Sequence, residues 1–404
     1  MNGPLAGVRV IDLSAVVSGP MAAGMLAEQG ADVIKVEPPG GDMSRRVGPA
    51  KGDISALFMA INRGKRSVVL DLKLAQARAV LEELIRDADV LIENFRPGTM
   101  ARLGLDYEQV RKSNPRLIYL SISGFGQSGP YAHARVYDYV IQAASGFADA
   151  HAGAESGTPG LLPTLLCDKL TALNASQAVC AALHARHARH EGQKIELSML
   201  DASIAFLWPE AMYNHGFLED PPPRMPEFGA NQKPWKCRDG WFTSMTPQND
   251  EFAALCRGFG RPELAQDARF ATMDGRRQHY QSLRDILEPI ALEQNVGEFV
   301  DRLVGEGAPV GRVNERASLG VDPQVRHNRT ISRYPMGDAG MVQLPRAAAL
   351  FSETPGPDSL QAPHAGQHSR ELLRELGKDA QEIDTLLESG AVRQALSADE
   401  AGQS

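Results

Sequence analysis

Long apolar runs are missing from this 404-residue sequence, and no stretch approaches the roughly 20 apolar residues that a membrane-spanning helix needs. The first ten residues also lack a basic segment followed by an apolar run, so no secretory signal is visible. Cysteine is scarce: the four residues Cys167, Cys180, Cys237 and Cys256 are widely spaced and form no C-x-x-C pair. This spacing argues against a disulfide scaffold and a structural zinc site, so we expect a cytoplasmic protein without a bound metal.

An overall excess of positive charge is absent too, because 50 acidic residues outnumber 42 basic ones and give a net charge of −8. Nucleic-acid binding requires a broad basic surface and is therefore disfavoured. A local positive excess nevertheless lies between Lys35 and Lys73, where only four acidic residues oppose the basic ones; these are Lys35, Arg45, Arg46, Lys51, Arg63, Lys65, Arg66 and Lys73. The segment predicts either a concentrated anion site or a solvated charged surface.

The first half of the chain alternates between short β-branched runs and helical patterns. Strands are predicted at Val8–Leu13, Asp32–Glu37, Ser67–Leu72, Val90–Glu93 and Leu117–Ile122, and helices at Gly19–Gln29, Gln76–Arg86 and Tyr107–Ser113. Such alternation predicts an α/β fold with a mostly parallel sheet that is covered on both faces, as in a Rossmann-like doubly wound domain.

The second half begins with a long helix predicted from Asp168 to about Arg189, a strand at Lys194–Met199 and a helix at Leu200–His215. Clustered prolines at 220–231 indicate a linker. Further elements are predicted at Trp241–Met245, Glu251–Gly258, Leu283–Gly305, Ser369–Gly377 and Gln381–Ser389. We therefore expect the first part of a large domain at 1–218, a linker and a smaller α+β domain at 219–325, and a linker with helices that return to the large domain at 326–404.

The turn after the first predicted strand lacks the fingerprint of a dinucleotide site. It runs from Ser14 to Pro20, and the next glycine after Gly19 is Gly24, so G-x-G-x-x-G is not formed. Pro20 also removes an amide donor at the start of the helix. NAD binding is therefore disfavoured, which leaves either another anion at this helix start or ordinary strand–helix packing.

Several segments, taken in order, resemble the class III CoA-transferase family, also known as the CaiB/BaiF superfamily of formyl-CoA and carnitine CoA-transferases. They are VIDLS at Val10–Ser14 followed by Gly19 and Pro20, GADVIKVEP at Gly30–Pro38, NRGKRS at Asn62–Ser67, LDLK at Leu70–Lys73, ENFRPG at Glu93–Gly98, SGFGQSGP at Ser123–Pro130, Tyr137-Asp138, Asp168, DPQV at Asp322–Val325 and ELLRELG at Glu371–Gly377. The resemblance implies a homodimer of two interlocked chains, with CoA and acyl-CoA as substrates and no tightly bound cofactor.

Asp168 aligns with the catalytic aspartate of that family. The resemblance implies that its carboxylate attacks an acyl-CoA thioester and carries the acyl group and then CoA. From its local sequence alone, Asp168 would be interpreted as the N-cap of the long helix, and both roles are compatible. Tyr137 and Asp138 are possible supporting residues.

The resemblance also implies a set of CoA contacts, position by position: Val16, Val17, Leu72, Lys73, Asn94, Phe95, Arg102, Arg135 and Tyr137. In the family pattern, Lys73 and Arg102 would meet phosphates, Phe95 would lie near adenine and Arg135 near the CoA arm. The alternative for Phe95 is a core position, and for Arg102 a surface charge on a helix. The aromatic residues Trp208, Tyr213 and Trp235 would line an acyl pocket or belong to the core.

Two other functions are also compatible with the sequence. Racemases of the same superfamily carry a histidine where this chain has Tyr137, and tyrosine is a poor general base at neutral pH, so transfer is favoured; His133 is out of register. A non-catalytic acyl-CoA-binding protein is the second alternative. The region 227–234 contains Gly229 but no run of glycines such as formyl-CoA transferases have, so we expect a different small or dicarboxylic acid as the acceptor.

Overall fold

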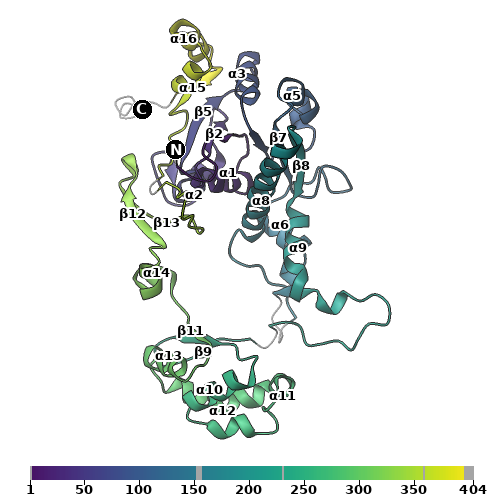
Figure 1. The fold of residues 1–404 in the computed structure, drawn as a ribbon, viewed down its shortest axis with the longest axis vertical. Coiled ribbons are helices and arrows are strands. Elements are labelled where there is room, and N and C mark those ends of the chain that lie inside the picture. Colours follow the sequence, from purple (N-terminus) through teal and green to yellow (C-terminus); the bar gives the residue numbers. More distant parts are fainter. Residues whose placement is uncertain (1, 152–156, 230–231, 358–359, 395–404) are drawn as a thin grey trace. The chain divides into compact units, whose positions relative to one another are not determined.

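The computed structural model describes residues 2–151, 157–229, 232–357 and 360–394. The chain divides into two compact units (Figure 1). The first comprises Met1–Pro222 together with Arg329–Ser404, and the second is Pro223–Asn328. Among the described helices, none is both long enough and apolar enough to cross a membrane.

The first unit is built on a seven-stranded sheet in the order β14-β5-β2-β1-β6-β7-β8. The six strands from β5 to β8 are parallel, and β14 pairs antiparallel with β5 at the edge. Their bounds are β1 Arg9–Asp12, β2 Asp32–Glu37, β5 Lys65–Leu70, β6 Val90–Glu93, β7 Ile118–Ser123, β8 Gln193–Ser198 and β14 Val392–Arg393.

The order of the parallel strands reverses at β1. The chain runs from β1 outward through β2 to β5, then returns to the other side of β1 and runs through β6 and β7 to β8. This is the doubly wound Rossmann order, in which ligands bind outside the carboxyl ends of the strands where the order reverses. The predicted fold class is confirmed.

Helices cover both faces of this sheet because successive strand residues point to opposite sides. Ile11 belongs to the core formed with α3, α5, α15 and α16, whereas its neighbour Val10 belongs to the core formed with α1 and α8. These helices are α1 Ser18–Glu28, α3 Ala75–Arg86, α5 Tyr107–Ser113, α8 Leu166–Arg189, α15 Ser369–Glu375 and α16 Ala380–Glu388. The remaining elements of this unit are η1 Met43–Arg46, β3 Ala50–Lys51, β4 Ile54–Ser55, α2 Ala56–Asn62, α4 Thr99–Leu103, α6 Asp138–Ala144, α7 Phe147–Ala150, α9 Met199–Ala211, η2 Tyr213–His215, β12 Ile331–Pro335, η5 Gly337–Ala339 and β13 Met341–Pro345.

The second unit packs helices around a small antiparallel sheet in the order β11-β10-β9. Phe242 lies at the centre of its core, with its ring 5.5 Å from that of Phe299 and stacked on Trp235. Trp235 is therefore a core residue here. The elements are β9 Trp235–Lys236, β10 Trp241–Ser244, α10 Asn249–Gly258, η3 Pro262–Gln266, α11 Met273–Gln278, α12 Tyr280–Leu292, α13 Val296–Gly305, β11 Val310–Arg312, η4 Arg316–Val321 and α14 Pro323–His327.

Element bounds agree with the sequence where apolar periodicity is strong and differ where it is not. The strands predicted at Asp32–Glu37 and Val90–Glu93 have those bounds in the structure. The continuous helical stretch predicted at Leu283–Gly305 is instead interrupted between Leu292 and Val296, so it forms α12 and α13. The short edge strand β14 and the hairpin β12–β13 were not predicted.

Candidate active site

The segments that follow β1 and β6 are hydrogen-bonded to each other at the point where the strand order reverses. The Asn94 amide, directly after β6, accepts a hydrogen bond from the Ala15 N–H and donates one to the Ala15 carbonyl, each at 2.8 Å. Asn94 therefore holds the turn that leads from β1 into α1. This turn, from Ser14 to Pro20, is the one that lacks the G-x-G-x-x-G pattern.

The residues predicted to contact CoA follow several strands of the same sheet. Val16 and Val17 follow β1, Leu72 and Lys73 follow β5, and Asn94 and Phe95 follow β6. Because the carboxyl ends of parallel strands share one edge, the topology brings these pairs to the same side of the sheet. Val17 is buried, Leu72 and Phe95 are half-buried against the core beside α3, and Lys73 is exposed.

The other predicted contacts lie on less regular parts of the chain. Arg102 is exposed on α4 and donates a hydrogen bond to the Thr99 hydroxyl at 2.9 Å. Arg135 and Tyr137 are exposed in the segment that precedes α6, and His133 is exposed in the same segment.

Asp168 lies in the first turn of α8 and is only 8% exposed. The interpretation of this residue as an N-cap is wrong, since α8 begins at Leu166 and its N-cap is Leu165. The helix starts earlier because Leu166 and Cys167 extend its apolar, core-facing pattern. Asp168 therefore has no capping task within its own helix.

The capping task belongs instead to Asp138, the first residue of α6, which is 2% exposed. Its Oδ2 accepts a hydrogen bond from the backbone N–H of Asp168 at 2.9 Å, and its Oδ1 accepts one from Gln142 Nε2 at 2.7 Å. The Gln142 side chain also accepts a hydrogen bond from the Leu162 N–H at 2.9 Å. Asp138 and Gln142 together fix the segment that leads into α8 and hold a second carboxylate beside Asp168.

The backbone N–H and the hydroxyl of Ser18, the first residue of α1, lie close enough to the Asp168 carboxylate to lower its pKa. Burial, and then the negative charge of Asp138, raise the pKa of Asp168 to about 6, although the two Ser18 donors oppose that rise. The neighbouring Cys167 is fully buried, and burial raises the pKa of its thiol to about 11. Asp168 is thus mostly ionised at neutral pH, whereas the adjacent thiol is neutral.

The basic segment between Lys35 and Lys73 is largely internal, so the prediction of an anion site formed by the segment as a whole is wrong. Lys35 and Lys65 are buried, and their ammonium groups lie 2.8 Å from Asp42 Oδ2 and 2.7 Å from Asp12 Oδ2. The guanidinium of Arg45 is paired with Glu37 at 2.6 Å. A charge of this kind is retained in an interior only when it is paired and hydrogen-bonded, which leaves these cations committed to the fold.

The aromatic residues that were candidates for lining an acyl pocket do not all belong to the same part of the fold. Trp235 is 5% exposed in the core of the second unit, whereas Trp208 on α9 of the first unit is 49% exposed. Trp235 is therefore a core side chain and not a pocket lining. The glycine-poor region 227–234 lies partly outside the described residues, because 230 and 231 are not among them.

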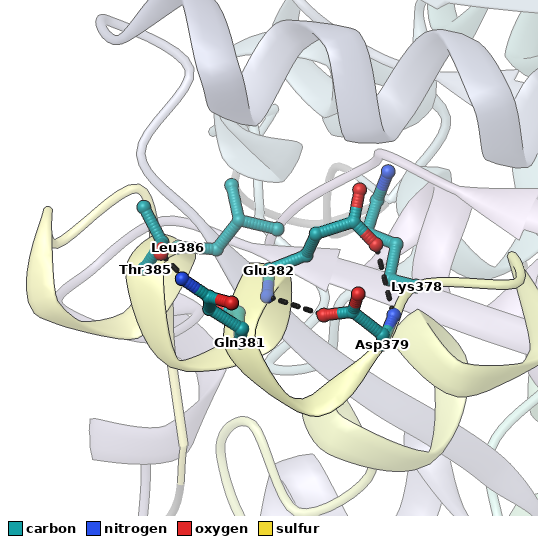
Figure 2. A pocket seen from close by; sticks show the side chains of 6 residues that line it. All are labelled: Lys378, Asp379, Gln381, Glu382, Thr385 and Leu386. Carbon is teal, nitrogen blue, oxygen red and sulfur yellow. Dashed lines mark hydrogen bonds between the residues drawn. The ribbon is translucent and has the colours of Figure 1, made fainter.

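A surface hollow at the start of α16 involves none of the predicted site residues (Figure 2). Asp379 and Glu382 form a reciprocal capping box there, with two hydrogen bonds of 2.9 Å. Lys378 is paired with Glu83 at 2.8 Å. These charges are accounted for by the helix start and its packing against α3.

Three functional features were missed from the sequence: Ser18, Gln142 and the buried lysine pair Lys35 and Lys65. A helical spacing of four between Asp138 and Gln142 was a usable signal, since residues at i and i+4 face each other on a helix. Ser18 stood in the turn after the first strand, but nothing local showed that it would face a residue so distant in sequence.

Together these features define a doubly wound α/β domain with an ionised, buried carboxylate in the first turn of a long helix. The sequence model of CoA-transferase family III matches residues 5–369. The chain belongs to this family of enzymes, as the resemblance indicated.

Similar proteins span nearly the whole chain. The succinate–glutarate CoA-transferase of Agrobacterium fabrum is 37% identical over 384 residues, which are 92% of this chain and 96% of that protein. The acetyl-CoA:oxalate CoA-transferase of Acetobacter aceti is 39% identical over 352 residues, 85% of this chain and 88% of that protein. The crystal structure of a CaiB/BaiF family protein from Brucella suis has a TM-score of 0.82 at 32% identity and covers 93% of this chain and 100% of that one.

Proposed function

We propose that this enzyme moves CoA from an acyl-CoA donor to a small dicarboxylic acid, with Asp168 as the covalent carrier. The single observation that carries the proposal is the state of Asp168: a carboxylate that is 8% exposed, mostly ionised at neutral pH and free of any capping role in its helix. Such a group combines the charge of a nucleophile with the exclusion of water that reactive acyl intermediates need.

The reaction consists of four attacks, in which CoA thiolate leaves twice and attacks twice and only the donor acid departs. The Asp168 carboxylate attacks the thioester carbonyl, which gives an aspartyl–acyl anhydride and CoA thiolate. The thiolate attacks the Asp168 γ-carbonyl and releases the donor acid, which leaves an aspartyl-CoA thioester. The acceptor carboxylate then attacks that γ-carbonyl and frees the thiolate, which attacks the acceptor's acyl carbon and restores the Asp168 carboxylate. No ATP is consumed.

For CoA itself, we propose the carboxyl edge of the sheet, with contacts from the segments after β1, β5 and β6. Lys73, Arg102 and Arg135 are exposed cations, in contrast to the buried Lys35 and Lys65. Lys73 and Arg102 are the basic groups proposed for the phosphates, and Arg135 is proposed for the CoA arm. We also propose that the enzyme is the homodimer that the resemblance implies. The choice of a dicarboxylic acceptor rests on the two transferases, whose names specify succinate, glutarate and oxalate.

Racemisation is the less favoured function because, among the residues that the structure describes, no second acid–base group that is free to exchange a proton is found beside Asp168. The residue before Asp138 is Tyr137, whose side chain is 64% exposed. Asp138 itself is engaged by the Asp168 N–H and by Gln142. Proton exchange at both faces of an α-carbon requires two groups that are free to take and return a proton.

We expect new CoA esters when the enzyme is incubated with succinyl-CoA or acetyl-CoA and a mixture of mono- and dicarboxylic acids. Mass spectrometry of the CoA products identifies the acceptor, and omission of the acids is the control. A failure to form any dicarboxylyl-CoA from glutarate, oxalate or succinate would contradict the substrate class. Deuterium incorporation at the α-carbon of the donor without any acceptor would instead identify a racemase.

The rate should depend on pH through Asp168, because only its ionised form attacks. With acetyl-CoA as the donor and an acceptor acid that stays ionised throughout, kcat/KM is expected to rise with pH through about 6 and to level off above 7. Asp138→Asn removes the charge that raises the pKa of Asp168, so the rise should move to lower pH. A profile that is flat between pH 5 and 8, or a shift in the opposite direction, would contradict this assignment.

A further inference from the structure

We propose that Ser18 is a second catalytic residue, whose backbone N–H and hydroxyl together bind the γ-carbonyl oxygen of Asp168 while that carbon is under attack. The inference rests on the covalent role of Asp168 proposed above and assigns the oxyanion donors for two of its four steps. Both donors belong to one residue, the first of α1. α1 packs along α8 with Ala22 and Ala172 in one core and Met25 in contact with Ser176. One turn before Ala22 and Ala172, this register places Ser18 opposite Asp168.

The position of Ser18 relative to Asp168 is set by the packing of α1 against α8. The two helices share one hydrophobic core, in which Ala22 and Ala23 of α1 meet Ala172 and Ala175 of α8. All four side chains are fully buried, and their small size lets the helix backbones approach closely. Ser18 is itself only 3% exposed, so its two donors act where little water competes for them.

The turn that presents Ser18 is held in a strained shape. Val16 has a φ of 70°, in the left-handed region that a β-branched residue rarely adopts. Its N–H donates to Asp42 Oδ1 at 3.3 Å, and Asn94 holds both polar groups of Ala15. Such strain persists only where the surroundings impose it, and it is commonest at functional sites.

The ammonium groups of two buried lysines donate hydrogen bonds to the two ends of the turn between β1 and α1. Lys35 Nζ donates to the Ser14 carbonyl at 3.0 Å, and Lys65 Nζ donates to the Pro20 carbonyl at 2.7 Å. The two ends of the turn also approach each other closely at Gly19, where an added Cβ would lie 2.2 Å from Ser14 Cβ. Lys35 and Lys65 are thus positioning residues, because they hold the turn that orients the N–H and the hydroxyl of Ser18.

The chemistry identifies the steps in which these donors act. In the anhydride and in the aspartyl-CoA thioester, the γ-carbonyl oxygen of Asp168 carries little charge. When CoA thiolate or the acceptor carboxylate adds to that carbon, the oxygen becomes a full oxyanion. Donors fixed beforehand stabilise that charge without reorganising, and they accelerate the step because they bind the transition state more strongly than the intermediate.

The decisive variants are Ser18→Ala and Ser18→Cys. Ser18→Ala keeps the N–H and removes the hydroxyl, so we expect kcat with acetyl-CoA and glutarate or oxalate to fall roughly 10²-fold while KM changes little. Ser18→Cys substitutes a weak S–H donor of similar size and should give an intermediate rate. Ser176→Ala is the matched control, because Ser176 lies in α8, is 9% exposed and contacts Met25 of α1. It should leave kcat within about twofold.

A direct measurement isolates the reacting carbon. Enzyme loaded with acetyl-CoA alone is freed of excess donor and treated with hydroxylamine, which attacks the Asp168 γ-carbonyl and leaves a hydroxamate detectable by mass spectrometry. The rate of hydroxamate formation should fall in Ser18→Ala by a factor similar to the fall in kcat. An unchanged hydroxylamine rate, or a kcat within threefold of wild type in folded Ser18→Ala, would overturn the role of Ser18. If no label reached residue 168 in the wild-type enzyme, the covalent mechanism itself would be wrong.

Discussion

Asp168→Asn is expected to abolish CoA transfer, with a loss of at least about 10⁴-fold in kcat, because the amide cannot accept an acyl group and return it. The variant keeps the shape of the side chain and an oxygen that can face the Ser18 donors. The assay is transfer from acetyl-CoA or succinyl-CoA to glutarate or oxalate, with quantification of the new CoA ester.

The same variant should be more stable than the wild-type enzyme at pH 8. The pKa of Asp168 rises from 3.8 to about 6 on folding, so ionisation of this buried group disfavours the folded state by about 3 kcal/mol above pH 6. Below pH 3.8 the carboxyl is protonated in both states and the difference should vanish. Urea unfolding at pH 8 and at pH 3 measures it. A gain in stability together with a loss of activity is typical of functional groups held in unfavourable surroundings.

Asp201→Asn is the matched control for this substitution. Asp201 is the acidic residue in the first turn of α9, as Asp168 is in the first turn of α8, but it is exposed. Its replacement should leave both the rate and the pH dependence of unfolding nearly unchanged. If Asp168→Asn retained more than a few per cent of the wild-type transfer rate, the carrier would have to be a different residue.

Lys65→Met is expected to lower the free energy of unfolding by about 3 kcal/mol at pH 7. It would remove the donor to three buried oxygens, which are Asp12 Oδ2 at 2.7 Å, the Pro20 carbonyl at 2.7 Å and Asn62 Oδ1 at 2.8 Å. Lys35 lies 3.8 Å from Asp12 and compensates that carboxylate in part, which keeps the loss near the lower end for a broken buried ion pair.

Lys194→Met supplies the comparison for this loss of stability. The side chains of Lys194 and its partner Glu196 are 39% and 53% exposed, and an exposed pair of this kind contributes about 1 kcal/mol or less. Urea unfolding of both variants at one pH separates the two cases. An equal, small effect in both would mean that the Asp12–Lys35–Lys65 cluster tolerates the loss of one member, and the proposed anchoring of the Pro20 carbonyl would then be incorrect.

The fold of the larger unit could be predicted from the sequence because its strands and its helices have different patterns of apolar residues. Apolar runs such as Val90-Leu91-Ile92 mark strands buried on both faces, and the alternation with helices fixes the parallel topology. Unit boundaries and edge elements carry weaker signals: β14 has only Val392 and Arg393 and shows no periodicity. The break between α12 and α13 was missed because apolar residues continue on both sides of it.

Only those parts of the candidate site that lie in recognisable sequence motifs could be predicted. Asp168 was identified by resemblance, but its environment depends on Ser18 and Asp138, which come from other helices. Local reasoning assigned Asp168 to a helix cap because the start of α8 was placed two residues too late. The charges of Lys35 and Lys65 were misinterpreted for a related reason. A sequence shows that a residue is basic, but it does not show whether that residue is buried and paired with a carboxylate such as Asp12 or Asp42.

The antiparallel strand β14 has a consequence for how the chain reaches its folded state during synthesis. β5 is made early, yet its outer edge is bonded by residues made much later: Val392 and Arg393 of β14, and His368, whose N–H donates to the Ser67 carbonyl at 2.9 Å. Until those residues leave the ribosome, β5 presents an unpaired backbone edge next to a hydrophobic core, a surface that invites pairing with other nascent chains. The late pairing of β14 and His368 with β5 therefore closes an edge that could otherwise pair with another chain.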